Sequence, residues 1–191
     1  TLHNFSNTDF EKKIQGKNVI NVFRRAKYII IQFEKNLMAI HLRMTGKLYV
    51  VDNFDSNKKH ISLYLQFNDK YLIYEDTRKF GRFYMYKNMD ILNNKLGVEP
   101  LSDIFSKKWR IENMKSKKRQ IKSILFDQSF ICGLGNIYID ESLWRAKIHP
   151  LALSNKISKA KIIDLHSSIV KVLSDSIKLG GSTTVSYTHL T

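Results

Sequence analysis

The stretch Ile131-Cys-Gly-Leu-Gly-Asn-Ile-Tyr138 decides the fold of the second half of this chain. Two glycines and an asparagine separate two segments whose composition is typical of helices. Glycine lets a backbone approach a ligand closely and adopt positive φ, and the N–H groups that open the next helix are unpaired donors with a partial positive charge. The stretch therefore predicts a phosphate-binding connection between two helices.

The charge of the chain favours the same kind of ligand. It holds 32 Lys and Arg against 17 Asp and Glu, which gives a formal net charge of +15 over 191 residues. An excess of this size attracts polyanions such as DNA and RNA. Lysine heavily outnumbers arginine, so a generally basic protein from a lysine-rich proteome would show the same balance. Charge alone leaves these two interpretations about equal.

Length and hydrophobic content predict one or two folded domains. The chain is 43% hydrophobic and 12% aromatic, which is enough apolar material for a core. Cys132 is the single cysteine, so these residues form no internal disulfide and no cysteine-rich zinc site. The sequence shows neither a signal-peptide pattern nor an apolar run of membrane-spanning length, so we expect a cytoplasmic protein with no membrane role.

Residues 19–86 carry the pattern of β structure. In Ile61–Phe67, apolar residues alternate with Ser, Tyr and Gln, so one face of this strand points to the core. The segments Glu34–Asn36 and Asn68–Lys70 predict tight hairpin turns. Short strands joined by such turns favour an antiparallel sandwich or barrel over alternating βαβ units. The strands that we expect most clearly are 28–33, 37–42, 61–67, 71–74 and 83–86.

The pattern changes at Leu96-Gly-Val-Glu-Pro100, where a glycine and one of the two prolines precede a helical stretch. We expect a first domain at residues 1–96 and a helical second domain at residues 97–182, which makes an α+β chain. The helices that we expect lie at about 103–113, 117–129, 137–146 and 158–179.

The segments Lys117–Gln128 and Gly133–Glu141 together resemble the helix–two-turns–helix core of the bacterial formamidopyrimidine-DNA glycosylases. The resemblance covers about residues 10–182. Further matching motifs follow in the order and spacing of the family, at Arg24–Tyr28, His41–Gly46, Asp76–Gly81, Leu96–Leu101 and Ile148–Pro150.

The resemblance implies a truncated N-terminal antiparallel β-sandwich followed by a helix–two-turns–helix (H2TH) DNA-binding domain. It implies a monomeric, nucleoid-associated protein of the bacterial cytoplasm whose partner is double-stranded damaged DNA. The implied activity is base-excision repair by a DNA glycosylase and abasic-site lyase. The substrates would be oxidised purines, chiefly 8-oxoguanine and formamidopyrimidines.

An enzyme that acts on a damaged base must unstack it at a cost of roughly a few kcal/mol, and apolar side chains fill the space that it leaves. The resemblance assigns this role to Met44, Arg78 and Phe80, with the arginine bonding the orphaned partner base. Taken singly, Phe80 also suits a core aromatic, Met44 a hairpin residue and Arg78 a solvated cation. The surrounding motifs favour the DNA-binding role.

Cations and the glycine-rich turn carry the remaining predicted site residues. The resemblance makes Lys27 a proton donor in β-elimination, although an edge lysine covering apolar surface has the same pattern. Lys117 and Lys122 match phosphate-facing lysines, and a basic helix surface is the simpler alternative.

The turn itself supplies Gly135, Asn136 and Tyr138 as DNA-binding residues. Asn136 would offer its side-chain amide and backbone N–H to a phosphate, Gly133 and Gly135 would give backbone freedom, and Tyr138 would brace the turn. The alternative is a plain helix–helix connection in which Asn136 caps the second helix.

The chain departs from the family at both ends. The family's nucleophile is an N-terminal proline followed by a glutamate, whereas this chain opens Thr1-Leu-His-Asn. We expect an upstream segment to carry both residues and the first helix, and residues 1–191 alone to be inactive. The family continues beyond Gly181 into a four-cysteine zinc finger, so we expect zinc there, no metal or other cofactor in this chain, and a non-native tail at 183–191.

Two alternatives stay open at this point. A non-catalytic nucleic-acid-binding protein could use the same helical turn. An endonuclease VIII-like glycosylase would prefer oxidised pyrimidines, but Asp76–Gly81 and Gly135–Tyr138 resemble the purine-repair branch more closely.

Overall fold

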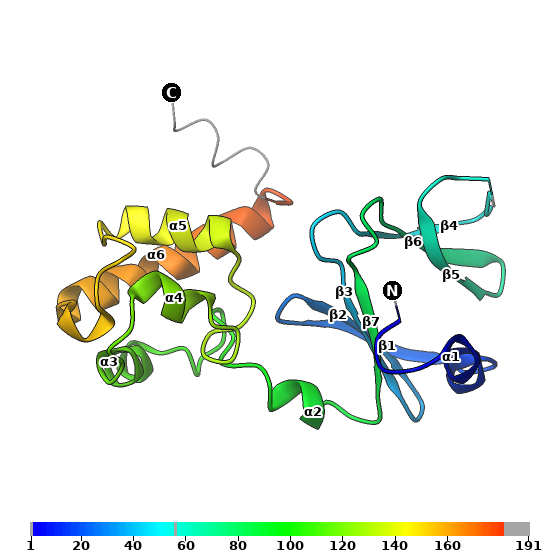
Figure 1. Ribbon diagram of the computed structural model, residues 1–191, viewed down its shortest axis with the longest axis horizontal. Helices are drawn as coiled ribbons and strands as arrows, with labels where there is room; N and C mark the ends of the chain where they lie inside the picture. Colours follow the sequence, from blue (N-terminus) through cyan, green and yellow to red (C-terminus); the bar gives the residue numbers. More distant parts are fainter. Residues whose placement is uncertain (1, 56, 182–191) are drawn as a thin grey trace. The chain divides into compact units, whose positions relative to one another are not determined.

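The computed structural model describes residues 2–55 and 57–181 (Figure 1). The chain divides into two compact units, Thr1–Ile91 and Leu92–Thr191, each with its own hydrophobic core. Antiparallel sheets occupy the first unit and helices the second, which confirms the predicted α+β class. The expected tail at 183–191 lies outside the described residues.

The first unit contains two antiparallel sheets. Its core takes side chains from both of them, among them Met38 from one sheet and Leu65 from the other, so the two sheets pack as a sandwich. The four-stranded sheet has the order β1 (Val19–Arg25), β2 (Tyr28–Phe33), β3 (Leu37–His41), β7 (Arg82–Tyr86). The three-stranded sheet has the order β4 (Lys47–Val51), β6 (Lys70–Glu75), β5 (Ile61–Phe67).

Strand position explains strand composition. Leu37–Ile40 of β3 are all buried, because this strand lies between β2 and β7. Strand β1 is at the edge of its sheet, and its Ile20 and Val22 are each 58% exposed. In β5, Leu65 is buried and Tyr64 exposed, which confirms the predicted alternation.

Helix α1 (Asn7–Ile14) was absent from the predicted elements. Ser6 caps it by accepting a hydrogen bond from the Asp9 N–H at 3.1 Å, and Phe10 is its single buried residue. A serine followed three residues later by an acid is a helix-start signal, but the helix is short and mostly polar, so its hydrophobic periodicity is weak.

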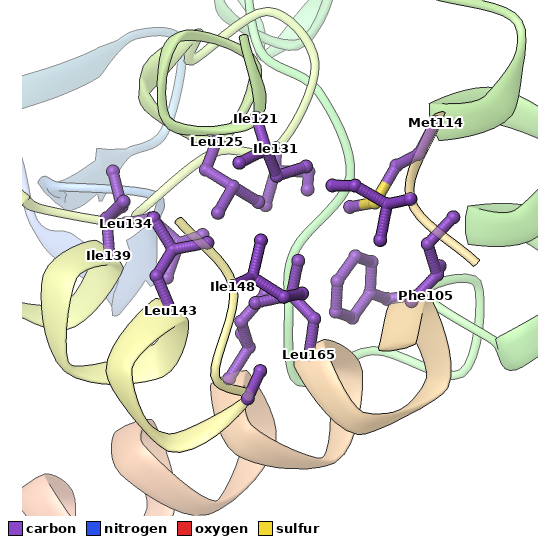
Figure 2. Packing of buried hydrophobic residues seen from close by; sticks show 14 residues of the cluster. Phe105, Met114, Ile121, Leu125, Ile131, Leu134, Ile139, Leu143, Ile148 and Leu165 are labelled. Carbon is purple, nitrogen blue, oxygen red and sulfur yellow. The ribbon is translucent and has the colours of Figure 1, made fainter. Parts of the chain in front are cut away.

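The second unit is helical. Its core draws Met114 from α3, Ile121 and Leu125 from α4, Leu143 from α5 and Leu165 from α6 (Figure 2). No helix in the described part of the chain has the length and apolarity to cross a membrane. The helices are α3 (Lys107–Lys115), α4 (Ile121–Phe126), α5 (Asn136–Arg145), the 3-10 turn η1 (Ser154–Lys156) and α6 (Lys159–Lys178), preceded by the short α2 (Asp90–Asn93) at the division between units.

Two predicted helices have different bounds. The helix expected at 117–129 is α4, which begins only at Ile121 because Ile121 N–H and Lys122 N–H donate to the carbonyls of Ala152 and Pro150. The helix expected at 103–113 is α3, which begins after Ser106, whose hydroxyl accepts the Trp109 N–H. Both helices therefore start closer to the C-terminus than expected, α3 because of its serine cap and α4 because of bonds to a distant segment.

Candidate nucleic-acid interface

Two loops of the β unit bring Met44, Arg78 and Phe80 together. One Arg78 Nη lies 3.5 Å from Met44 Sδ, and Arg78 Cζ lies 4.6 Å from the centre of the Phe80 ring. Met44 is 76% exposed and Phe80 47% exposed, so neither belongs to the core. We call these three side chains the loop-tip cluster. It presents two large apolar groups and a guanidinium to solvent.

Both loops contain strained backbone beside the cluster. Arg43, in the loop between β3 and β4, has φ of 60°, and Lys79, in the loop between β6 and β7, has φ of 56°. A non-glycine residue in this left-handed region costs about 1 kcal/mol or more, and it persists only where neighbouring contacts hold it. The loops therefore have a defined shape in the free protein.

A buried carboxylate holds the two loops. Asp76 is fully buried, and it accepts hydrogen bonds from the Thr45 hydroxyl, the Tyr74 hydroxyl (2.8 Å), the Gly81 N–H (2.9 Å) and the Arg78 N–H (3.2 Å). Burial raises the pKa of Asp76, but these hydrogen bonds outweigh it and hold the pKa well below its usual range. Burial and the bond to Asp76 raise the pKa of Tyr74.

Asp76 is part of a predicted motif but had no predicted role, and Tyr74 was not among the predicted site residues. The available signal was an acid two residues before Arg78 and five residues before a glycine.

Lys27 lies in the turn between β1 and β2 and is half-buried. The residue before it, Ala26, has φ of 52°, and its carbonyl accepts a hydrogen bond from Arg24 at 2.8 Å. Burial lowers the pKa of Lys27, and the charge of Arg43 lowers it further. An ammonium group with a lowered pKa gives up its proton more readily, which is the property that a proton donor needs.

His41 is a neighbour of Lys27 that the sequence analysis did not single out. Burial lowers its pKa to about 4, with further contributions from the charges of Arg43 and Lys27. Its Nδ1 accepts the Arg43 N–H at 3.0 Å, which requires an unprotonated nitrogen. His41 therefore supports the left-handed Arg43 as a neutral acceptor. Its position at the head of the His41–Gly46 motif was the signal for it.

The glycine-rich turn between α4 and α5 differs in detail from its prediction. Gly133 has φ of 85°, as expected, but Gly135 is extended, with φ of −101°, and precedes the first helical residue, Asn136. Gly135 rather than Asn136 is therefore the N-cap residue, so this detail of the alternative is wrong. Among the described residues no side chain caps α5, so its opening N–H groups can serve another acceptor, at the positive end of the helix dipole.

Gln128 fixes the shape of this turn. Its Oε1 accepts the Gly133 N–H at 2.9 Å, and its Nε2 donates to the Leu134 carbonyl at 3.0 Å. Both ends of one amide are thus used to hold the backbone just before Gly135. This role was not predicted, because a glutamine just after a helix carries no distinguishing sequence pattern.

The two predicted phosphate-binding lysines are both half-buried. The Lys117 ammonium lies 5.0 Å from the centre of the Phe130 ring. Lys122 Nζ lies 2.6 Å from an Asp140 carboxylate oxygen, so its charge has a partner within the protein. Lys117 is the better placed of the two to add positive charge without first breaking an ion pair.

Tyr138 connects α5 to α6. Its hydroxyl lies 2.8 Å from Ser176 Oγ, and its ring packs against the helical core. Glu141, on the same helix, pairs with Arg145 at 2.9 Å. The bracing by Tyr138 thus acts between helices rather than on the glycine-rich turn.

The first unit is an antiparallel sandwich with an exposed apolar and cationic loop-tip cluster. The second unit is helical, and the start of its helix α5 has no side-chain cap. Together these features define a DNA-binding protein of the helix–two-turns–helix class. Two family models match the chain. The formamidopyrimidine-DNA glycosylase N-terminal domain matches residues 1–83, and the formamidopyrimidine-DNA glycosylase H2TH domain matches residues 96–188. The chain belongs to the formamidopyrimidine-DNA glycosylase family, which confirms the resemblance.

Relatives and solved structures agree with this assignment. The formamidopyrimidine-DNA glycosylases of Lactobacillus helveticus and Streptococcus agalactiae are 41% and 39% identical to it, over 94% of this chain and 68% and 67% of their own lengths. The Lactococcus lactis enzyme bound non-covalently to DNA with an AP site superposes with a TM-score of 0.85 at 37% identity, covering 92% of this chain and 69% of that one. A MutM complex with DNA containing carbocyclic 8-oxo-G gives a TM-score of 0.86 at 37% identity, covering 93% and 68%.

The family's zinc does not fit the residues present. Cys132 is the single cysteine of the chain, and it lies fully buried. A four-cysteine zinc site therefore cannot be built from these residues.

Proposed function

We propose that this chain recognises oxidised purines in double-stranded DNA, as part of a glycosylase and abasic-site lyase of base-excision repair. Family membership supports the reaction class, and related structures contain DNA with an AP site or with carbocyclic 8-oxo-G. The observation that carries the proposal is the loop-tip cluster, in which exposed Met44 and Phe80 flank Arg78.

The cluster supplies what base extrusion requires. Unstacking a base costs roughly a few kcal/mol, and burying a Met or Phe side chain contributes about 1.5–3 kcal/mol each. The free energy gained by burying Met44 and Phe80 between base pairs is therefore of the same size as the cost of unstacking the base. The Arg78 guanidinium adds planar donors that can bond the base left without a partner.

The helical unit would hold the DNA backbone. The uncapped start of α5 offers N–H donors to a phosphate, and Lys117 adds a positive charge. Lys122 would exchange Asp140 for a phosphate. Gln128 keeps the turn in the shape that presents these donors.

Lys27 would serve as the proton donor in β-elimination, with its lowered pKa making it a stronger acid. Residues 1–191 alone would bind lesions without excising them, since the family's proline nucleophile is not among them and loss of a nucleophile removes many decades of rate. Borohydride trapping on an 8-oxoguanine duplex tests this: a covalent adduct with residues 1–191 would contradict it.

The central experiment measures discrimination, defined as the Kd for an intact duplex divided by the Kd for the same duplex with one 8-oxoguanine. Arg78→Ala should lower this ratio toward one. Lys70→Ala, which removes another exposed cation, paired with Asp52 at a hairpin, serves as the matched control and should leave the ratio unchanged. An unchanged ratio for Arg78→Ala would remove the basis of the proposal.

The same assay separates the alternatives. A non-catalytic phosphate-binding protein would have no lesion preference to lose, and it has no use for exposed Met44 and Phe80. An endonuclease VIII-like protein would prefer a duplex with an oxidised pyrimidine. We expect the preference to be for the oxidised purine.

A further inference from the structure

Next to the loop-tip cluster lies a second set of residues whose central carboxylate, that of Asp76, is fully buried and out of reach of DNA. We propose that Asp76, together with the Thr45 and Tyr74 hydroxyls, is a positioning unit that sets lesion discrimination. It does so by holding the loop between β3 and β4 and the loop between β6 and β7 in a fixed relative position. This inference rests on the proposed function of the loop-tip cluster, which it deepens.

Every member of the cluster is connected directly or through a neighbouring residue to Asp76. Thr45, which follows Met44, donates its hydroxyl to the carboxylate. The Arg78 N–H bonds the same carboxylate oxygen as Thr45. The Gly81 N–H, which follows Phe80, bonds the other oxygen. One carboxylate therefore sets the relative position of two loops whose contacting residues, Met44 and Arg78, are 34 positions apart in the sequence.

The Tyr74 hydroxyl gives independent support for a close fit. A Cβ at Gly81 would lie 1.6 Å from this oxygen, and a Cβ at Gly46 would lie 2.7 Å from it. Each loop thus contributes a glycine that leaves room for the same phenol oxygen. That oxygen in turn donates to Asp76 at 2.8 Å. A side chain at either glycine would push the loops off the carboxylate.

The carboxylate stays ionised throughout the pH range in which DNA is handled, since its hydrogen bonds hold its pKa well below the usual value. Hydrogen bonds to a charged group are stronger than neutral ones, and leaving a buried charge undersatisfied is costly. The unit can therefore hold the left-handed Arg43 and Lys79, whose strain would otherwise drive the loops toward other shapes.

The test uses two substitutions at Thr45, one that removes the hydroxyl and one that keeps it. Thr45→Val keeps the shape and removes the donor, whereas Thr45→Ser keeps the donor. We expect Thr45→Val to lower the discrimination ratio by about tenfold or more, which is the size of the loss of a hydrogen bond to a charged group. Thr45→Ser should stay within about twofold of the parent chain. The salt dependence of binding, which reports phosphate contacts, should be the same for both.

A double-mutant cycle separates positioning from general stability. If Thr45 acts through the cluster, Thr45→Val should cause little further loss of discrimination in a chain that already carries Arg78→Ala. Tyr74→Phe, which removes a second donor to Asp76 without changing the ring, carries the same expectation. It takes the place of Thr45→Val if circular dichroism shows that variant to be unfolded.

The outcomes are distinct. If Arg78→Ala lowers discrimination but Thr45→Val and Tyr74→Phe only lower the free energy of unfolding, the unit is structural and the inference is overturned while the proposed function stands. If Arg78→Ala itself leaves discrimination unchanged, both fail. A flattened salt dependence in Thr45→Val would also overturn the inference, because it would assign the hydroxyl to backbone binding.

Discussion

Substitution of Gly81 by alanine is the sharpest test of how tightly the loops are fitted. The new Cβ would lie 1.6 Å from the Tyr74 hydroxyl oxygen and 2.5 Å from its Cζ, whereas ordinary contacts begin at 3.4 Å. The phenol end would have to move by about 2 Å. Tyr74 is fully buried and packs edge-on against Phe83, with ring centres 4.9 Å apart, so the ring has little room to retreat.

The expected cost follows from these distances. Forcing an extra methyl group into a packed site costs about 1–3 kcal/mol, and breaking the Tyr74–Asp76 hydrogen bond adds about 1.5–3 kcal/mol. The φ of Gly81 lies outside the left-handed region, so alanine gains about 0.4–1 kcal/mol by restricting the unfolded chain. We expect a net loss of about 2–5 kcal/mol in the free energy of unfolding.

Urea denaturation of the parent chain and the variant measures this loss. Gly16→Ala is the matched control, since a Cβ there meets nothing within 4 Å and only the positive φ of 66° is penalised. Introducing Gly81→Ala into a chain that carries Tyr74→Phe should cost less than in the parent, because the nearest atom has been removed. A loss for Gly81→Ala no larger than that for Gly16→Ala would refute the close fit.

Three further predictions concern other parts of the molecule. Lys117→Ala should flatten the slope of log affinity against log salt by up to about 0.9, and Lys122→Ala by less because of its ion pair with Asp140; unchanged slopes in both would contradict phosphate binding. Gly97→Ala should cost about 3 kcal/mol or more, since its Cβ would lie 2.2 Å from a backbone carbonyl oxygen that cannot yield; a parental urea midpoint would disprove this. His41, with its pKa lowered from 6.5 to about 4, should contribute stability in full above pH 6.5 that is lost as the pH falls toward 4, by up to about 3 kcal/mol, and His41→Asn should flatten that part of the stability profile.

Hydrophobic periodicity predicted the elements that bury a whole face. The alternation in Ile61–Phe67 gave β5 residue for residue, and the apolar run Tyr28–Phe33 gave β2. It could not give α1, where Phe10 is the single buried residue of the helix. Periodicity also predicted too early a start for α4, because the N–H groups of Ile121 and Lys122 donate to the carbonyls of Ala152 and Pro150, which no local pattern reveals.

The candidate site was predictable in its residue types but not in its construction. Met44 and Arg78 were recognised from motifs, yet their contact spans 34 positions and appears only in the folded sandwich. Asp76 and Gln128 act through hydrogen bonds to backbone N–H groups, and such partners depend on loop geometry rather than on sequence pattern. Residues whose function is to hold another residue are therefore the ones that sequence reasoning overlooks.

The outer strand β1 has a practical consequence for handling the polypeptide. Within the described residues, it has a neighbour in its sheet only on the side of β2, and it exposes the β-branched Ile20 and Val22. An exposed edge strand has unpaired backbone N–H and C=O groups that can pair with a strand of another chain. Concentrated solutions of residues 1–191 should therefore form intermolecular β ribbons as salt screens the charge of +15, and low ionic strength is the better storage condition.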